Sequence, residues 1–135
     1  MGRVINLDNI GTQRNWMVKA IVLALTELTE KTYPGKEAHD ILAFVALSLE
    51  AISDTIDQSV SAWEKRGYWV KADRFRLEWL WSKQLAENLR KAISKGDWES
   101  ADKIAVQIRQ KLNNVNVSPR HRMGKPWIGA WEKLR

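Results

Sequence analysis

Residues 36–66 read KEAHDILAFVALSLEAISDTIDQSVSAWEKR, the longest regular stretch of the chain. Its apolar residues recur every three or four positions, at Ala38, Leu42, Val45, Leu49, Ile52, Ile56, Val60 and Trp63. This spacing keeps them on one face of an α-helix about 46 Å long. Lys65 and Arg66 followed by Gly67 end the pattern, because glycine readily takes the left-handed conformation of a helix C-cap.

Three further stretches carry the same spacing, one before this helix and two after it. The first predicts a helix from the cap residue Thr12 to the break at Tyr33-Pro34-Gly35, with its stripe on Met17, Ile21, Ala24, Leu25 and Leu28. The third helix is expected over residues 68–94, with its main stripe on Tyr68, Ala72, Phe75, Trp79, Ala86, Leu89 and Ile93. The fourth begins at the N-cap residue Asp97 and carries Trp98, Ala101, Ala105, Ile108, Leu112 and Val115.

No segment alternates apolar and polar residues over the length of a strand, so no sheet is predicted. Amphipathic helices with short connections pack against their neighbours in sequence. The sequence therefore predicts an all-α protein, an antiparallel up-and-down four-helix bundle over residues 1–117 with two longer central helices. Residues 118–135 are a basic, Trp-containing C-terminal extension, and its apolar end leads us to expect that it docks on the bundle.

Composition excludes several classes of protein. The 135 residues contain no Cys, so disulfide frameworks, thiolate metal sites and thiol nucleophiles are ruled out. The longest apolar runs, residues 20–25 and 41–47, are far shorter than the roughly 20 residues that a membrane span needs. The first residues carry no apolar stretch of signal-peptide length. We therefore expect a cytoplasmic protein that does not contact membranes.

Catalytic signatures are missing as well. The sequence contains no GxxxxGK or GxGxxG phosphate motif, no HExxH and no G-x-S-x-G. Its two histidines, His39 and His121, have no spacing that indicates a catalytic triad, and His39 is expected on a helix surface. The expectation is a protein without cofactor, bound metal or catalytic residues, and a non-enzymatic role is favoured.

The formal net charge of +6 is distributed unevenly. The balance is −4 over residues 1–64, +6 over 65–95 and +4 over 118–135. Lys71 and Arg74 fall in the first two turns of the third helix, where the helix dipole is already positive, so a bound anion would compensate them. The candidate anion-binding residues are Arg66, Lys71, Arg74, Arg76, Arg120 and Arg122. The alternative is that these cations pair with carboxylates of the second helix.

Those carboxylates are Glu50, Asp54, Asp57 and Glu64, which share one face of the second helix and form an acidic stripe. Two-metal sites of helical bundles use such carboxylates, but they also need Glu-x-x-His pairs, and residue 36, three before His39, is Lys. A salt-bridged or solvated stripe is therefore favoured over a carboxylate-based metalloprotein.

Eight Trp are an unusual number for this length. Trp63 and Trp79 lie on apolar stripes and are expected in the core. Four apolar residues of the third helix lie off its main stripe, namely Trp69, Leu77, Leu80 and Trp81.

These patterns leave three functional hypotheses. Because Trp and Arg are enriched at interface hot spots, the first is a protein-interaction or self-association module that uses the four off-stripe residues. The second is binding of nucleic acid or another polyanion, since Trp interleaved with Lys and Arg is typical of single-strand binders. The third is the carboxylate metalloprotein described above.

Overall fold

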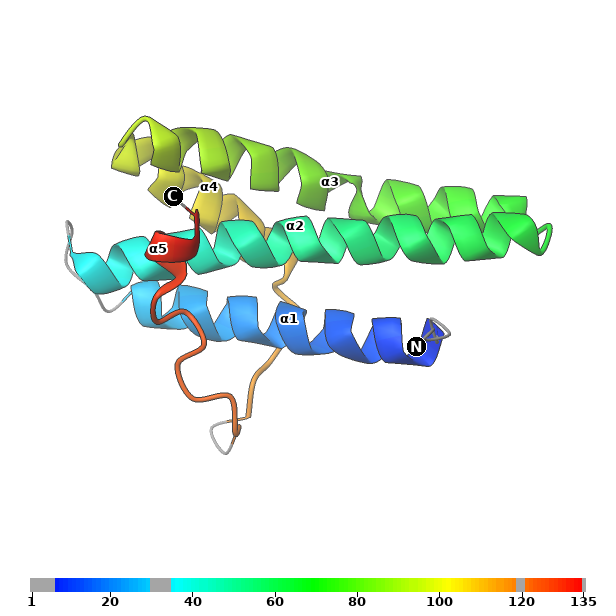
Figure 1. The fold of residues 1–135 in the computed structure, drawn as a ribbon, viewed down its shortest axis with the longest axis horizontal. Helices are drawn as coiled ribbons and strands as arrows, with labels where there is room; N and C mark the ends of the chain where they lie inside the picture. Colours follow the sequence, from blue (N-terminus) through cyan, green and yellow to red (C-terminus); the bar gives the residue numbers. More distant parts are fainter. Residues whose placement is uncertain (1–6, 30–34, 119–120, 135) are drawn as a thin grey trace.

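The computed structural model describes residues 7–29, 35–118 and 121–134 (Figure 1). It contains five helices: α1 (Leu7–Leu28), α2 (Lys36–Lys65), α3 (Trp69–Ser94), α4 (Trp98–Lys111) and α5 (Ala130–Leu134). No strand occurs in these ranges, so the all-α prediction is confirmed. None of the described helices has the length and apolarity to cross a membrane.

The helix limits agree with the sequence prediction except at the start of α1 and at the end of α4, which stops at Lys111 and leaves Val115 outside the helix. Helix α1 begins at Leu7, so Thr12 lies inside it and the prediction that Thr12 caps it was wrong. The apolar pattern reaches further back than Thr12, because Ile10 is buried in the core. Tyr33 and Pro34, which we expected to end this helix, lie outside the described residues.

Helix α2 is the centre of the molecule, and α1, α3 and α5 all pack against it. The expected core positions Ile52 and Ile56 are buried, and Trp63, Phe75 and Trp79 pack half-buried against the core. Helix α3 returns alongside α2 after a turn at Gly67, whose φ of +83° suits glycine.

Helix α3 faces α2 with residues spaced alternately three and four apart, and several of these residues are small. Ala72, Ser82 and Ala86 are all nearly inaccessible to solvent. Small side chains at such positions allow two helix backbones to approach closely. The long α2–α3 hairpin is thus held together along most of its length.

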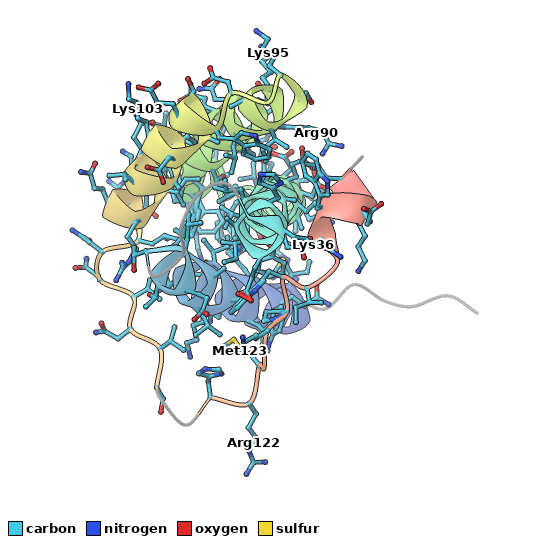
Figure 2. The ribbon with its side chains drawn as sticks, turned by 90° about the vertical axis from the view of Figure 1, so that its left-hand side faces the viewer. Lys36, Arg90, Lys95, Lys103, Arg122 and Met123 are labelled. Carbon is cyan, nitrogen blue, oxygen red and sulfur yellow. The ribbon has the colours of Figure 1, made fainter. Side chains whose placement is uncertain are left out.

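Helices α4 and α5 lie on opposite sides of this hairpin, as the view along the helices shows (Figure 2). Helix α4 has 14 residues, about 21 Å, whereas α3 has 26 residues, about 39 Å. It starts beside the C-terminal end of α3 and then leaves it in the direction of α1 (Figure 1). Among the described residues, no fourth helix therefore lies beside the N-terminal half of α3.

Residues 113–118 and 121–129, here called the strap, carry the chain from α4 to α5. They pass around α1 from one side of the molecule to the other (Figures 1 and 2). Val115 and Val117 pack half-buried against the core on the way. At the far end Trp127 is only 2% exposed, and α5 then packs on α2. The apolar end of the C-terminal extension is thus in contact with the helices.

Candidate functional site

The exposed apolar residues of α3 gather in its N-terminal half. Leu77 is 71% exposed and Val70 is 68% exposed, and Trp69 and Leu80 are exposed as well. All of these residues point away from the side of α3 that packs on α2. Exposed apolar groups of this size on one short helical segment make it a candidate contact surface.

A regular apolar stripe runs along most of α3 and is here called the α3 stripe: Val70, Leu77, Trp81, Leu85 and Ala92. The steps of seven and four residues place all five on one face of the helix. At the C-terminal end, where α4 packs, Ala92 is buried and Leu85 packs against the core. At the N-terminal end Val70 and Leu77 are exposed. One continuous apolar face is therefore covered at one end and open at the other.

Trp81 lies at the boundary between these two parts. Its ring stacks on Trp79, with centroids 5.7 Å apart and an interplanar angle of 24°. Nearby, Trp63 and Phe75 meet edge to face at 4.9 Å. Such geometries are the favourable ones for aromatic pairs, so a half-buried aromatic layer closes the core where α4 is absent.

Two of the predicted anion-binding residues are held by groups of their own hairpin. Arg76 donates hydrogen bonds to Glu64 at 2.8 Å and to Asp73 at 2.6 Å, and these bonds raise its pKa further. The Lys71 ammonium lies 4.5 Å above the centroid of the Trp63 ring. Both cations thus have intramolecular partners. For Arg76 this is the alternative considered above, in which the cations pair with carboxylates of the second helix.

The remaining candidates for anion binding are scattered. Arg66 and Arg74 are exposed near the hairpin turn, and neither forms an ion pair within the described ranges. Arg122 lies on the strap beyond α1 (Figure 2), and the strap lies far along the molecule from the hairpin turn (Figure 1). Arg120 lies outside the described residues. The structure therefore gathers Arg66, Lys71, Arg74 and Arg76 at the hairpin but not Arg122.

The acidic stripe of α2 is only partly neutralised. The Arg90 guanidinium bonds both carboxylate oxygens of Glu50, at 2.9 and 3.0 Å. Asp54 and Asp57 are exposed. In the part of the chain that the structure describes, no three His, Asp or Glu side chains are placed to hold a metal ion together. The metalloprotein hypothesis gains no support from this geometry.

Arg14 is a residue of structural importance that the sequence analysis missed. Its guanidinium donates to the Thr55 hydroxyl at 3.1 Å, to the Thr55 carbonyl at 3.3 Å and to the Ser59 hydroxyl at 2.8 Å. It also lies 4.9 Å from the centroid of the Phe75 ring, so it links α1, α2 and α3. Burial lowers its pKa. The detectable signal was its position four residues after Ile10, where the apolar spacing calls for an apolar residue.

His39, which we expected on a helix surface, is only partly exposed and packs against aromatic rings. Its ring stacks on Trp98 at 3.8 Å and lies 5.4 Å from Trp131. Its Nε2 atom is buried and meets no hydrogen-bond partner among the described residues. Burial lowers the pKa of His39, and the neighbouring Asp40 offsets this only in part.

Asp40 holds the start of α5 in place. It is 5% exposed, and its carboxylate accepts hydrogen bonds from the backbone N–H groups of Gly129 at 3.3 Å and Trp131 at 3.0 Å. Free backbone N–H groups at a helix start need such an acceptor. Asp40 and His39 together therefore fasten the C-terminal segment to α2.

Two features of the described residues thus remain as candidates for function: the open end of the α3 stripe and the group of cations at the hairpin turn. Both offer contact chemistry, in the form of apolar area and guanidinium groups. No protein-family model matches this chain, and the comparisons found no similar curated protein and no similar solved structure.

Proposed function

We propose that this protein is a protein-interaction module that associates with itself through the open end of the α3 stripe. The observation that carries the proposal is Leu77, which is 71% exposed on a face whose other end is packed in the core. A side chain of that size gains roughly 1.5–3 kcal/mol on full burial. The exposed Trp69 and Leu80 and the half-buried Trp81 belong to the same part of α3 and add aromatic and apolar area of the kind found at interface centres.

We further propose that α1–α4 are an antiparallel up-and-down four-helix bundle that is complete only at one end. The difference in length between α3 and α4, about 18 Å, supports this interpretation, because it leaves a helix position empty beside the hairpin. A second copy of the chain carries the same unfilled position. In a two-fold symmetric dimer both subunits use the same surface, so the open ends of two copies can cover each other.

Binding of nucleic acid or another polyanion is the second candidate, but it has weaker support. Of the four hairpin cations, Arg76 and Lys71 already have partners on the hairpin. A polyanion site would lose affinity steeply as salt concentration rises. Association through Leu77 would depend far less on salt, so the two candidates make different predictions.

The test is the molar mass in solution, measured by size-exclusion chromatography with light scattering from micromolar to millimolar concentration. We expect the wild-type chain to approach twice 15.6 kDa. Leu77→Ser should remain a monomer because it removes the most exposed apolar side chain of the stripe. Ile128→Ser is the matched control, since Ile128 is 66% exposed but lies on the strap. A wild-type chain that stays at 15.6 kDa throughout the range would refute the proposal.

A further inference from the structure

The α3 stripe also indicates how two copies would pair, an inference that rests on the proposed self-association. We infer that the two α3 helices lie antiparallel about a two-fold axis passing between residues 75 and 76. In this arrangement Arg74 of each copy pairs with Glu78 of the partner subunit. The partner is therefore a second copy of this chain, held in one register.

The apolar residues are arranged symmetrically about that point. In an antiparallel pair, a residue meets the one that lies equally far on the other side of the axis. Val70 and Trp81 have their midpoint between residues 75 and 76, so each faces the other across the interface. Leu77 and the partner's Leu77 then lie about 4.5 Å apart along the helix axis, close enough for their side chains to touch. The open end of the stripe thus covers itself.

The charges beside the stripe have almost the same centre of symmetry. The midpoint of Arg74 and Glu78 is residue 76, which differs from the apolar midpoint by half a residue, about 0.75 Å. At about 100° per residue, both side chains project on the same side of the open end of the stripe, roughly 40° and 80° from the centre of Val70, Leu77 and Trp81. A two-fold axis brings like sides of two antiparallel helices together. Each Arg74 therefore meets the partner's Glu78, and two ion pairs form per dimer.

Both charged groups are available for this contact. Arg74 and Glu78 are exposed, and among the residues described neither takes part in an ion pair. A parallel two-fold arrangement would instead place these side chains of the two subunits on opposite sides of the interface, so Arg74 would not meet the partner's Glu78. Opposite charges that face each other favour association, so the charge pattern favours the antiparallel arrangement.

The extent of the overlap fits the length of the open face. With the axis between residues 75 and 76, the first residue of the partner's α3, its Trp69, lies opposite Ser82. The partner helix therefore ends before Leu85, from which the stripe is packed into the core beside α4. Each α3 thus occupies the position that the other subunit's α4 leaves empty.

Charge reversal tests this pairing without depending on the stability of any one variant. Arg74→Glu and Glu78→Arg each create two like-charge contacts in a homodimer, and each alone should weaken dimerisation by about tenfold or more in Kd. An equimolar mixture of the two variants should form a heterodimer, because every pair then joins opposite charges. Arg66→Glu is the control, since it reverses an exposed cation outside the stripe and should leave the dimer intact.

The outcomes separate the two proposals. Weakened homodimers together with recovery in the mixture would support the register. A wild-type chain that dimerises, but whose charge-reversed variants dimerise equally well or show no recovery when mixed, would overturn the register and leave self-association standing. A wild-type chain that stays monomeric would overturn both.

Discussion

Replacement of Asp40 tests how the C-terminal segment is fastened. Asp40→Ala removes the acceptor of two backbone hydrogen bonds, from Gly129 at 3.3 Å and from Trp131 at 3.0 Å. A hydrogen bond to a charged group contributes about 1.5–3 kcal/mol, and the first of these two is long. The variant also no longer carries the desolvation penalty of a buried carboxylate, and this reduces the net loss of free energy. We expect a loss of about 2–4 kcal/mol in the free energy that holds α5 on α2.

The loss should be local. Helix α5 has five residues and cannot persist without its contacts, because short isolated helices are unstable in water. A loss of about 2–4 kcal/mol corresponds to a roughly 30- to 1,000-fold larger open population. The assay is hydrogen exchange of the Trp131 amide, which should accelerate by that factor while the amides of α2 and α3 change little.

Two further variants make this test specific. Asp40→Asn keeps one acceptor oxygen and should lose about half as much free energy. Asp54→Ala removes an exposed carboxylate from the same helix and should leave the exchange of Trp131 unchanged. If Asp40→Ala exchanged at the wild-type rate, the assigned role of Asp40 would be wrong.

Three other predictions concern stability. Burial lowers the pKa of His39, so the unfolded chain binds the imidazole proton more tightly than the folded chain. The contribution of His39 to the free energy of unfolding is therefore at its maximum above about pH 6.5. It decreases as the pH falls from there to the lower pKa of the folded state. His39→Phe, which keeps the ring stack, should flatten that part of the pH profile, and an unaltered profile would count against the burial of this ring. In urea titrations Ile52→Ala should cost about 2–5 kcal/mol, whereas Leu77→Ala should change the stability of the monomer by less than about 0.5 kcal/mol; equal costs would contradict the assignment of Leu77 to an open face. Arg14→Met should lose about 1–3 kcal/mol through its three hydrogen bonds, and the control Lys19→Met, on an exposed part of the same helix, should lose almost nothing.

The helices could be predicted from the sequence because their signal is local. Apolar spacing located both ends of α2 and α3 and the start of α4 within a residue or two, but it carried α4 on to Val115, whereas the helix ends at Lys111. Gly67 and Asp97 lie at helix ends in the structure, as predicted. Thr12 misled the prediction because cap preference is a property of residue types, and Thr also occurs inside helices. The burial of Ile10, which extends α1 to Leu7, depends on contacts that spacing alone does not reveal.

The candidate site was predictable only where it depends on helix geometry. Counting residues around α3 identified Leu77 as lying off the main apolar stripe but placed it beside that stripe, whereas the structure exposes 71% of this side chain. The packing of His39 against Trp98 and Trp131 could not be predicted from local spacing, because these two residues come from distant parts of the chain. Asp40 reaches partners 89 and 91 residues away, and no local pattern records such a contact.

The path of the strap around α1 couples the C-terminal segment to the first helix. The strap passes outside α1 and leads to the buried Trp127 and to α5, which packs on α2. Because Asp40 of α2 accepts two hydrogen bonds from the start of α5, it also helps to keep the strap in its place across α1. A change at Asp40 is therefore expected to uncover part of a helix that Asp40 itself does not belong to.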